Sequence, residues 1–291
     1  MANVNVFDVP EKPQWCPGCG DYSILSSFKT AITELGLDPH RIVVVTGIGC
    51  GSKISHHVRA YGYEGLHGRI LPLAEGIKMA NPKLTVIGIG GDGDGFSEGG
   101  NHFVHAPRKN VNYTYMVQDN HIYALTTGQT SPTTPKNLPN KTSPTEQLYE
   151  EYKPLPAALI NGCTFVGSCF AGNMRHTSDM MKKAIMHKGF AFLNIYQPCV
   201  TWNNVNTYQW YMQKCYDLQK ENHDASNFDA ALAKALEPYR NGFERLPVGV
   251  FYESNARKPL DELHPVLAKG VIPAEKDITN VDISALLKEM E

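Results

Sequence analysis

The feature that most constrains the fold of this chain is an alternation of short apolar runs with helical patterns. Each run is followed by glycine or by a polar turn, which is typical of buried strands. The runs cover residues 41–47, 84–90, 112–117, 164–167 and 190–196, and the helical patterns cover residues 22–35, 72–80, 97–105 and 178–187. Nearly continuous apolar strands that alternate with helices predict an α/β fold, in which helices cover both faces of a mostly parallel sheet.

The composition is that of an ordinary globular protein, with 42% hydrophobic and 19% charged residues among 291. The formal net charge is -2, so charge gives no reason to expect nucleic acid or an anionic membrane as a partner. The first residues lack the basic start and the apolar stretch of a signal peptide. Because no run of 18 apolar residues occurs, we expect no membrane span and a cytoplasmic location.

Three segments are expected along the chain. Residues 1–20 carry a Cys-x-x-Cys motif, residues 21–250 form the main domain, and residues 251–291 are a charged, proline-spotted tail that wraps a surface or a partner. Within the main domain, residues 126–156 hold six prolines and many Ser, Thr and Asn residues. We expect this stretch to be a loop over the functional site, because long loops in compact domains are usually functional.

Polar segments follow four of the predicted strands. In a parallel α/β sheet, ligands bind beyond the carboxyl ends of the strands. The segments that fall on this edge are IGCGSK at 48–53, GDGDG at 91–95, QDNHIY at 118–123 and QPC at 197–199.

A magnesium site is predicted from two of these segments. Asp92 lies between Gly91 and Gly93 after one strand, and Asn120 follows the next strand, with 26 residues between it and Gly93. This pattern resembles the thiamine diphosphate fingerprint. Mg²⁺ prefers oxygen ligands, so the side chains of Asp92 and Asn120 and the backbone carbonyl of Ile122 are the expected protein ligands. The glycines let the backbone approach the phosphates closely.

Two adjacent residues at the end of the second strand could be the magnesium ligand, because the sequence there reads Asp119-Asn120-His121. We assign the ligand to Asn120, since Asp119 would add negative charge that the diphosphate does not need. The alternative to the whole assignment is an ordinary strand-to-helix turn that happens to read Gly-Asp-Gly.

The seven cysteines predict a metal or cluster site. Their number is odd and the chain shows no export signal, and both observations argue against a disulfide framework. Cys16 and Cys19 form a Cys-x-x-Cys motif, which is found in zinc half-sites, redox dithiols and cluster half-sites. In a redox dithiol the motif normally follows a strand, and no strand is predicted before this one. Cys50 and Cys199 are the best candidates for two further ligands, because both follow predicted strands on the binding edge.

Four thiolates suit zinc as well as a [4Fe–4S] cluster. We favour the cluster, because a thiamine site that releases electrons needs an acceptor and zinc is redox-silent. The remaining cysteines are expected to be core or half-buried thiols, with the last of them in a helix; they are Cys163, Cys169 and Cys215.

Together these motifs resemble the beta subunit of the 2-oxoacid:ferredoxin oxidoreductases, and most of all the two-subunit 2-oxoglutarate and general 2-oxoacid enzymes. The resemblance covers residues 15–199 and rests on WCPGCG, IGCGSKI, LHGR, GDGDG, DNHIYALTTGQTSPTT and QPC. It implies a thiamine diphosphate-binding fold and the oxidative decarboxylation of a 2-oxoacid, with 2-oxoglutarate as the best guess. Coenzyme A takes the acyl group and electrons pass through the cluster to ferredoxin; the reverse reaction would fix carbon dioxide.

The resemblance also implies roles for individual residues. Those lining the cofactor are Ile48, Gly49, Cys50, Gly51, His67, Ala124 and Leu125, and Gly93 and Asp94 contact its diphosphate. Relatives often carry a lysine where this chain has Thr127. If that lysine binds the distal carboxylate of the substrate, Lys53, His57 or Arg59 are the candidates to replace it.

Partners are implied as well. The chain has one diphosphate-type domain, so an alpha subunit is expected to bring the pyrimidine domain and its activating glutamate, in a dimer of heterodimers. The open alternatives are pyruvate as substrate, a non-redox thiamine enzyme with structural zinc, and a non-catalytic electron-transfer subunit.

Overall fold

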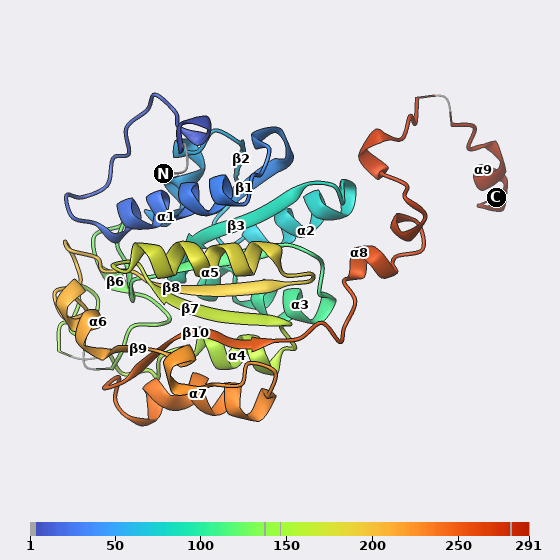
Figure 1. Ribbon diagram of the computed structural model, residues 1–291. Helices are drawn as coiled ribbons and strands as arrows, with labels where there is room; N and C mark the ends of the chain where they lie inside the picture. The colour runs from blue at the N-terminus through green and yellow to red at the C-terminus, as the bar shows by residue number, and fades with distance from the viewer. Residues whose placement is uncertain (1–3, 137, 146, 280, 291) are drawn as a thin grey trace.

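An eight-stranded sheet with the order β2-β1-β3-β4-β8-β7-β10-β9 forms the centre of the computed structural model, which describes residues 4–136, 138–145, 147–279 and 281–290 (Figure 1). The five predicted apolar runs are confirmed as strands: β1 (Ile42–Thr46), β3 (Thr85–Gly91), β4 (Thr114–Asp119), β7 (Phe165–Phe170) and β8 (Ala191–Tyr196). Three further strands of this sheet were not predicted: β2 (Tyr61–Glu64), β9 (Cys215–Asp217) and β10 (Leu246–Glu253).

The sheet is mostly parallel, as predicted. Strands β2, β1, β3, β4, β8 and β7 all pair in parallel, and only β10 runs antiparallel to its neighbour β7. Every residue of β1, β4, β7 and β8 is buried, which explains why these strands are nearly continuous apolar runs.

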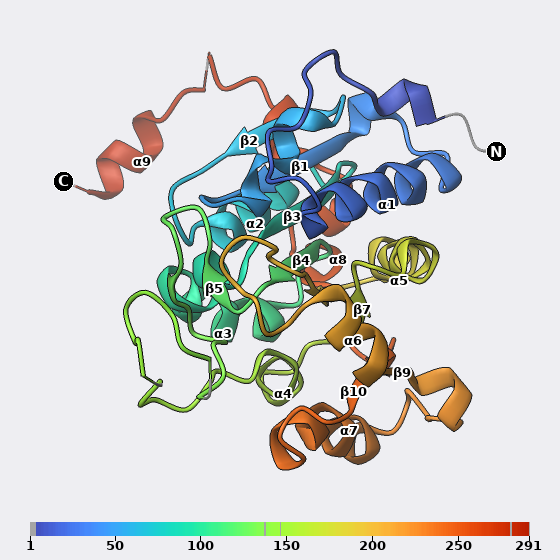
Figure 2. The same ribbon diagram turned by 90° about the vertical axis from the view of Figure 1, so that its left-hand side faces the viewer.

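Helices cover both faces of the sheet, which confirms the predicted α/β architecture. One face is covered by α1 (Gly20–Glu34) and α5 (Met174–Met186), and the apolar residues of both belong to one core cluster. The other face packs against α2 (Ile70–Ala80), α3 (Gly100–Lys109), α4 (Pro154–Ile160) and α7 (Phe228–Arg240), which share a second cluster (Figure 2).

Helix boundaries differ from the expected ones for local reasons. A single π-helical turn, η4 (Asp94–Glu98), follows β3 and delays the start of α3 to Gly100. The helix α5 begins four residues early, because the side chain of Asn173 accepts a hydrogen bond from the His176 amide and so caps it.

In its described residues, the proline-rich stretch is a loop as far as residue 153, apart from the short hairpin of β5 (Ile122–Tyr123) and β6 (Gln129–Thr130) at its start. The expected loop then ends in α4, because Pro154 stands at the first helical position, where proline is tolerated.

Two other expectations need correction. Cys215 does not lie in a helix: α6 (Tyr208–Lys214) ends just before it, and Cys215 begins β9, where it pairs with Leu246 of β10. The expected tail also begins within the sheet, because β10 runs to Glu253.

Beyond β10, the chain docks through α8 (Leu260–Leu263) and then leaves the body. The amide of Asn112 donates to Asp261 at this docking point. The short helix α9 (Ser284–Glu289) lies at the far end of an extended arm (Figure 1). None of the helices in the described part of the chain is long and apolar enough to span a bilayer.

Candidate functional site

The strand register brings the predicted polar segments together at one edge of the sheet. Gly91 of β3 pairs with Gln118 of β4, so Asp92 and Asp119 leave the sheet side by side. Asp119 in turn pairs with Tyr196 of β8, so Asn120 and Gln197 are neighbours. The side chains confirm this, because Asn120 Nδ2 donates a hydrogen bond to Gln197 Oε1 at 3.1 Å.

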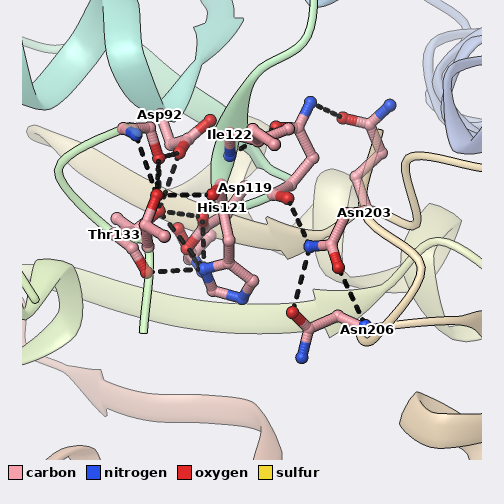
Figure 3. A network of polar contacts seen from close by, with 12 residues as sticks. Asp92, Asp119, His121, Ile122, Thr133, Asn203 and Asn206 are labelled. Carbon is pink, nitrogen blue, oxygen red and sulfur yellow. Dashed lines mark hydrogen bonds and ion pairs between the residues drawn. The ribbon is translucent and has the colours of Figure 1, made fainter. Parts of the chain in front are cut away.

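Asp92 is held in a buried polar network (Figure 3). The hydroxyl groups of Ser131 and Thr133 both donate to Asp92 Oδ2, the second at 2.7 Å. Only 1% of Asp92 is exposed, and burial, followed by the nearby Asp119, raises the pKa of this carboxyl to about 6. The network thus holds an acidic group that a cation would stabilise in its charged form.

Thr133 lies between two carboxylates. Its Oγ1 is 2.7 Å from Asp92 Oδ2 and also 2.7 Å from Asp119 Oδ1. A hydroxyl has one proton, so it can donate to only one of them at a time. Ser131 also donates to Asp92, and Asn194 to Asp119, so each carboxylate keeps a donor of its own while the two share the Thr133 hydroxyl. A divalent cation at Asp92 would reduce the repulsion between the two buried carboxylates.

Asp119 and Asn120 point to different places. Asp119 is tied into the sheet, where Asn194 Nδ2 donates to its Oδ2 at 3.1 Å. Asn120 instead lines a cavity of about 280 Å³ at the sheet edge. Its Oδ1 accepts from the amide of Ile122 at 3.0 Å, and its backbone carbonyl accepts from Asn203 Nδ2 (Figure 3).

Two glycines at this edge of the sheet border open space, and a third does not. A methyl group placed on Gly49 or Gly91 would meet no atom within 4 Å. At Gly93, in contrast, it would lie 2.3 Å from the Tyr123 ring. Two of these glycines thus border free space beside the backbone, while Gly93 is needed for close packing.

Asp94 connects the segments that follow β1 and precede α2. Its Oδ1 accepts from the backbone amides of Ile48 at 2.9 Å and Gly68 at 2.8 Å, and lies 3.0 Å from His67 Nδ1. Burial raises the pKa of this carboxyl. The predicted cofactor residues Ile48 and His67 are therefore brought to one place by Asp94.

The four cysteines proposed as cluster ligands line the same cavity as Asn120, Ala124 and Leu125. Cys16 is exposed, Cys50 is half-buried, and Cys19 and Cys199 are buried. Their segments are joined by hydrogen bonds: Trp15 Nε1 donates to the carbonyl of Cys50 at 2.8 Å, and the Gly20 amide donates to the carbonyl of Pro198.

Burial opposes the thiolate form of three of these cysteines. Burial raises the pKa of Cys19 far above its usual range and that of Cys50 to about 11, and it raises the pKa of Cys199 as well. Thiolates there would need a bound cation. In the described ranges, no three Cys, His, Asp or Glu side chains are grouped closely enough to hold one metal ion.

The candidates for substrate binding differ in position. Lys53 lines the cavity. His57 is buried with its ring 5.3 Å from that of Trp15, and Arg59 is exposed with its amide bonded to the Phe7 carbonyl. Neither of these two lines the cavity. Cys163 and Cys169 are core thiols and Cys215 is half-buried, as predicted.

Several polar residues of the site were not predicted; they are Ser131, Thr133, Asn194, Gln197, Asn203 and Asn206. Ser131 and Thr133 belong to the segment TSPTT. Its hydroxyl groups are the donors that a buried Asp92 requires, and this is the sequence feature that could have indicated their role. Asn203 and Asn206 bond to each other in the loop after β8, which sequence periodicity does not reveal.

Comparisons with known proteins agree with this arrangement. Residues 47–195 match the family described as "Thiamine pyrophosphate enzyme, C-terminal TPP binding domain". Residues 199–269 match the family of the C-terminal part of the pyruvate ferredoxin oxidoreductase beta chain. The first match contains the Asp92 network and the second begins at Cys199.

Individual relatives extend over nearly the whole chain. The 2-oxoacid:ferredoxin oxidoreductase subunit beta of Saccharolobus solfataricus is 42% identical over 262 residues, which cover 87% of this chain and 85% of the relative. That of a Sulfolobus species is 38% identical over 303 residues, with 97% and 98% covered.

A solved structure is also similar. The 2-oxoglutarate:ferredoxin oxidoreductase from Magnetococcus marinus, with 2-oxoglutarate, coenzyme A and succinyl-CoA bound, superposes with a TM-score of 0.88 at 35% identity. The similarity covers 99% of this chain and 96% of that one. The chain therefore belongs to the beta subunits of the thiamine diphosphate-dependent 2-oxoacid:ferredoxin oxidoreductases.

Proposed function

We propose that this subunit, in a complex with an alpha subunit, carries out the oxidative decarboxylation of 2-oxoglutarate to carbon dioxide and the acyl-CoA. The electrons pass through a [4Fe–4S] cluster to ferredoxin. The observation that carries the proposal is the single cavity that Asn120, Ala124 and Leu125 share with Cys16, Cys19, Cys50 and Cys199. A cofactor at the strand ends and a cluster on the cysteines would be neighbours there, which allows direct electron transfer.

Asp92, Asn120 and the carbonyl of Ile122 would hold magnesium, and the free space at Gly49 and Gly91 would receive the diphosphate. Thiamine diphosphate would supply, when bound, a nucleophilic carbon for the 2-oxo group and a cationic ring that takes up the electrons left by carbon dioxide. The chain orients the cofactor: Asp94 fixes the segments that contain Ile48 and His67, and Asn203 holds the backbone at Asn120. The other contacts proposed are Cys50, Gly51, Gly93, Ala124 and Leu125.

The cavity favours a cluster over zinc. A tetrahedral zinc site has Zn–S distances of about 2.3 Å, so its four sulfurs crowd round one ion. The described cysteines instead border a space of about 280 Å³, with no three-residue group tight enough for one ion. An iron–sulfur cube separates its four thiolates more widely, which suits this arrangement.

A second, alpha-type subunit is needed to complete the site. No Asp or Glu is among the described residues that line the cavity, so the activating carboxylate for the pyrimidine ring must come from elsewhere. Exposed apolar side chains surround the site, with Ile48 38%, Leu125 45% and Trp202 40% exposed. We infer that they are covered by an alpha subunit, in a dimer of heterodimers.

Two observations support 2-oxoglutarate as the substrate. Lys53 brings a positive charge into the cavity, which suits a substrate with a second carboxylate. The similar Magnetococcus marinus enzyme has 2-oxoglutarate bound. Pyruvate is the second candidate substrate. With a sufficiently reducing ferredoxin, the same site would run in reverse and fix carbon dioxide.

Co-expression with the alpha subunit tests the proposal. We expect the purified complex to reduce ferredoxin when 2-oxoglutarate, coenzyme A, Mg²⁺ and thiamine diphosphate are supplied, and the isolated chain to be inactive. Full turnover by the isolated chain would contradict the need for an alpha subunit. If the complex is inactive with 2-oxoglutarate but active with pyruvate, pyruvate is the substrate and the proposed choice is wrong.

A further inference from the structure

Thr127 has an unusual backbone. It lies in the turn between β5 and β6 with φ +78°, in the left-handed region that β-branched residues rarely adopt. Such conformations persist where the surrounding structure enforces them, and they are common at functional sites. Thr127 also lines the cavity that contains Asn120 and the four cysteines. This turn therefore holds the Thr127 side chain against the site at a conformational cost.

Lys141 of the long loop contacts Thr127, although it does not itself line the cavity. Its ammonium donates to Thr127 Oγ1 at 2.7 Å, and its backbone amide donates to the Gly128 carbonyl at 3.1 Å. Asn140, just before it, accepts from the amides of Thr142 and Ser143 and from the Thr130 hydroxyl. The tight turn at 140–143 is thus fixed to β6 and presents Lys141 to Thr127.

The charge of Lys141 is available to a ligand. In the described part of the chain, no carboxylate forms an ion pair with it. Its hydrogen bond to Thr127 uses one of three ammonium donors. Lys136, in the same loop, differs because it forms an ion pair with Glu150. Lys53 lies in the wall of the cavity, whose described lining contains no Asp or Glu, so Lys141 would be a second ammonium group near the site.

We propose that Lys141 binds the distal carboxylate of a dicarboxylic 2-oxoacid, and that Thr127 positions its ammonium for this contact. Lys141 would act with Lys53, from the side of the loop. The inference rests on the proposed function, and it makes the loop a determinant of substrate specificity. Thr127 is a positioning residue, since it acts through Lys141.

The test compares two substrates of equal chain length in the co-expressed complex: 2-oxoglutarate and 2-oxopentanoate, which lacks the distal carboxylate. For Lys141→Ala we expect kcat/KM for 2-oxoglutarate to fall roughly 10- to 100-fold, the effect of losing a hydrogen bond to a charged group. Most of the loss should appear in KM, because the distal carboxylate does not react. The value for 2-oxopentanoate should stay nearly unchanged.

Three variants separate specificity from loop structure. Lys136→Ala removes an ion pair from the same loop and should leave the ratio of the two substrates unchanged. Lys141→Arg should restore part of the preference, because it keeps the charge. Thr127→Val should give an intermediate loss, because it keeps the shape and removes the hydroxyl group.

Equal losses for both substrates in Lys141→Ala would overturn the inference, since the lysine would then only hold the loop. A wild-type complex without any preference for 2-oxoglutarate over 2-oxopentanoate would overturn it as well. A complex that oxidises neither acid would overturn the proposed function, and this inference with it.

Discussion

At the scale of single residues, the site is organised by two buried carboxylates that share one hydroxyl group. Thr133 lies at hydrogen-bond distance from both Asp92 and Asp119, and each carboxylate is buried. Asn120 extends past this pair into the cavity. The neighbouring residues Asp119 and Asn120 therefore differ: the first belongs to the buried network, and the second faces the cavity.

This difference predicts which substitution affects cofactor binding. In the presence of Mg²⁺, Asn120→Ala should weaken the binding of thiamine diphosphate roughly 10- to 100-fold, a range found even for the outer partners of metal ligands. Asp119→Asn should weaken it less, because the amide keeps the shape of the carboxylate and reduces the repulsion on Asp92. Titration calorimetry of the complex measures both. The opposite order would show that the ligand is Asp119.

Sequence reasoning located the central residues because each one follows a strand. Asp92 and Asn120 both leave the sheet at its binding edge, which an apolar run followed by a polar residue is enough to predict. Ser131, Thr133 and Lys141 were missed because they come from a loop. Their contacts depend on how the loop folds back over the edge, and no periodicity encodes that path.

At the scale of elements, the predicted strands were those whose residues are all or nearly all buried. The strand β10 was missed because Pro247 and Gly249 interrupt its apolar pattern, and the exposed strand β2 because it has no buried face. The helix α7 was missed; it contains Pro238 near its end. The π-helical turn at Asp94 moved the start of α3, because its conformation follows from the hydrogen bonds of the Asp94 carboxylate.

The junction between α2 and β3 depends on one buried lysine. Lys78 is 6% exposed, and its ammonium donates to the carbonyls of Pro82 and Leu84, each at 2.8 Å. Burial lowers the pKa of this group. The lysine thus replaces the backbone donors that are missing where the chain turns from the helix into the strand.

Removing this lysine should destabilise the fold. We expect Lys78→Met to lower the free energy of unfolding by roughly 2–4 kcal/mol, because two carbonyls lose their donor. Lys83→Met is the matched control, since Lys83 is exposed in the same turn and should have little effect. Urea denaturation of the two variants checks this. Equal stabilities would mean that water or other donors replace the lysine without loss.

At the scale of the whole molecule, the chain is one subunit of an oxidoreductase, and we propose that an alpha subunit completes its site. The edge of the sheet provides the Asp92 network, the space at Gly49 and Gly91, and the cysteine-lined cavity. It provides no acidic residue in the described lining of that cavity. The division between subunits was predicted from the single diphosphate-type domain, whereas the extended arm that ends in α9 was not foreseen in any detail (Figure 1).

The composition of the purified complex tests most directly whether cofactor and cluster share this cavity. Prepared without oxygen, it should contain about four iron and four sulfide ions per copy of this chain, with one thiamine diphosphate. Cys199→Ser should lose the iron, and Cys169→Ser, which alters a core thiol, should keep it. One zinc ion per chain and no iron would contradict the account.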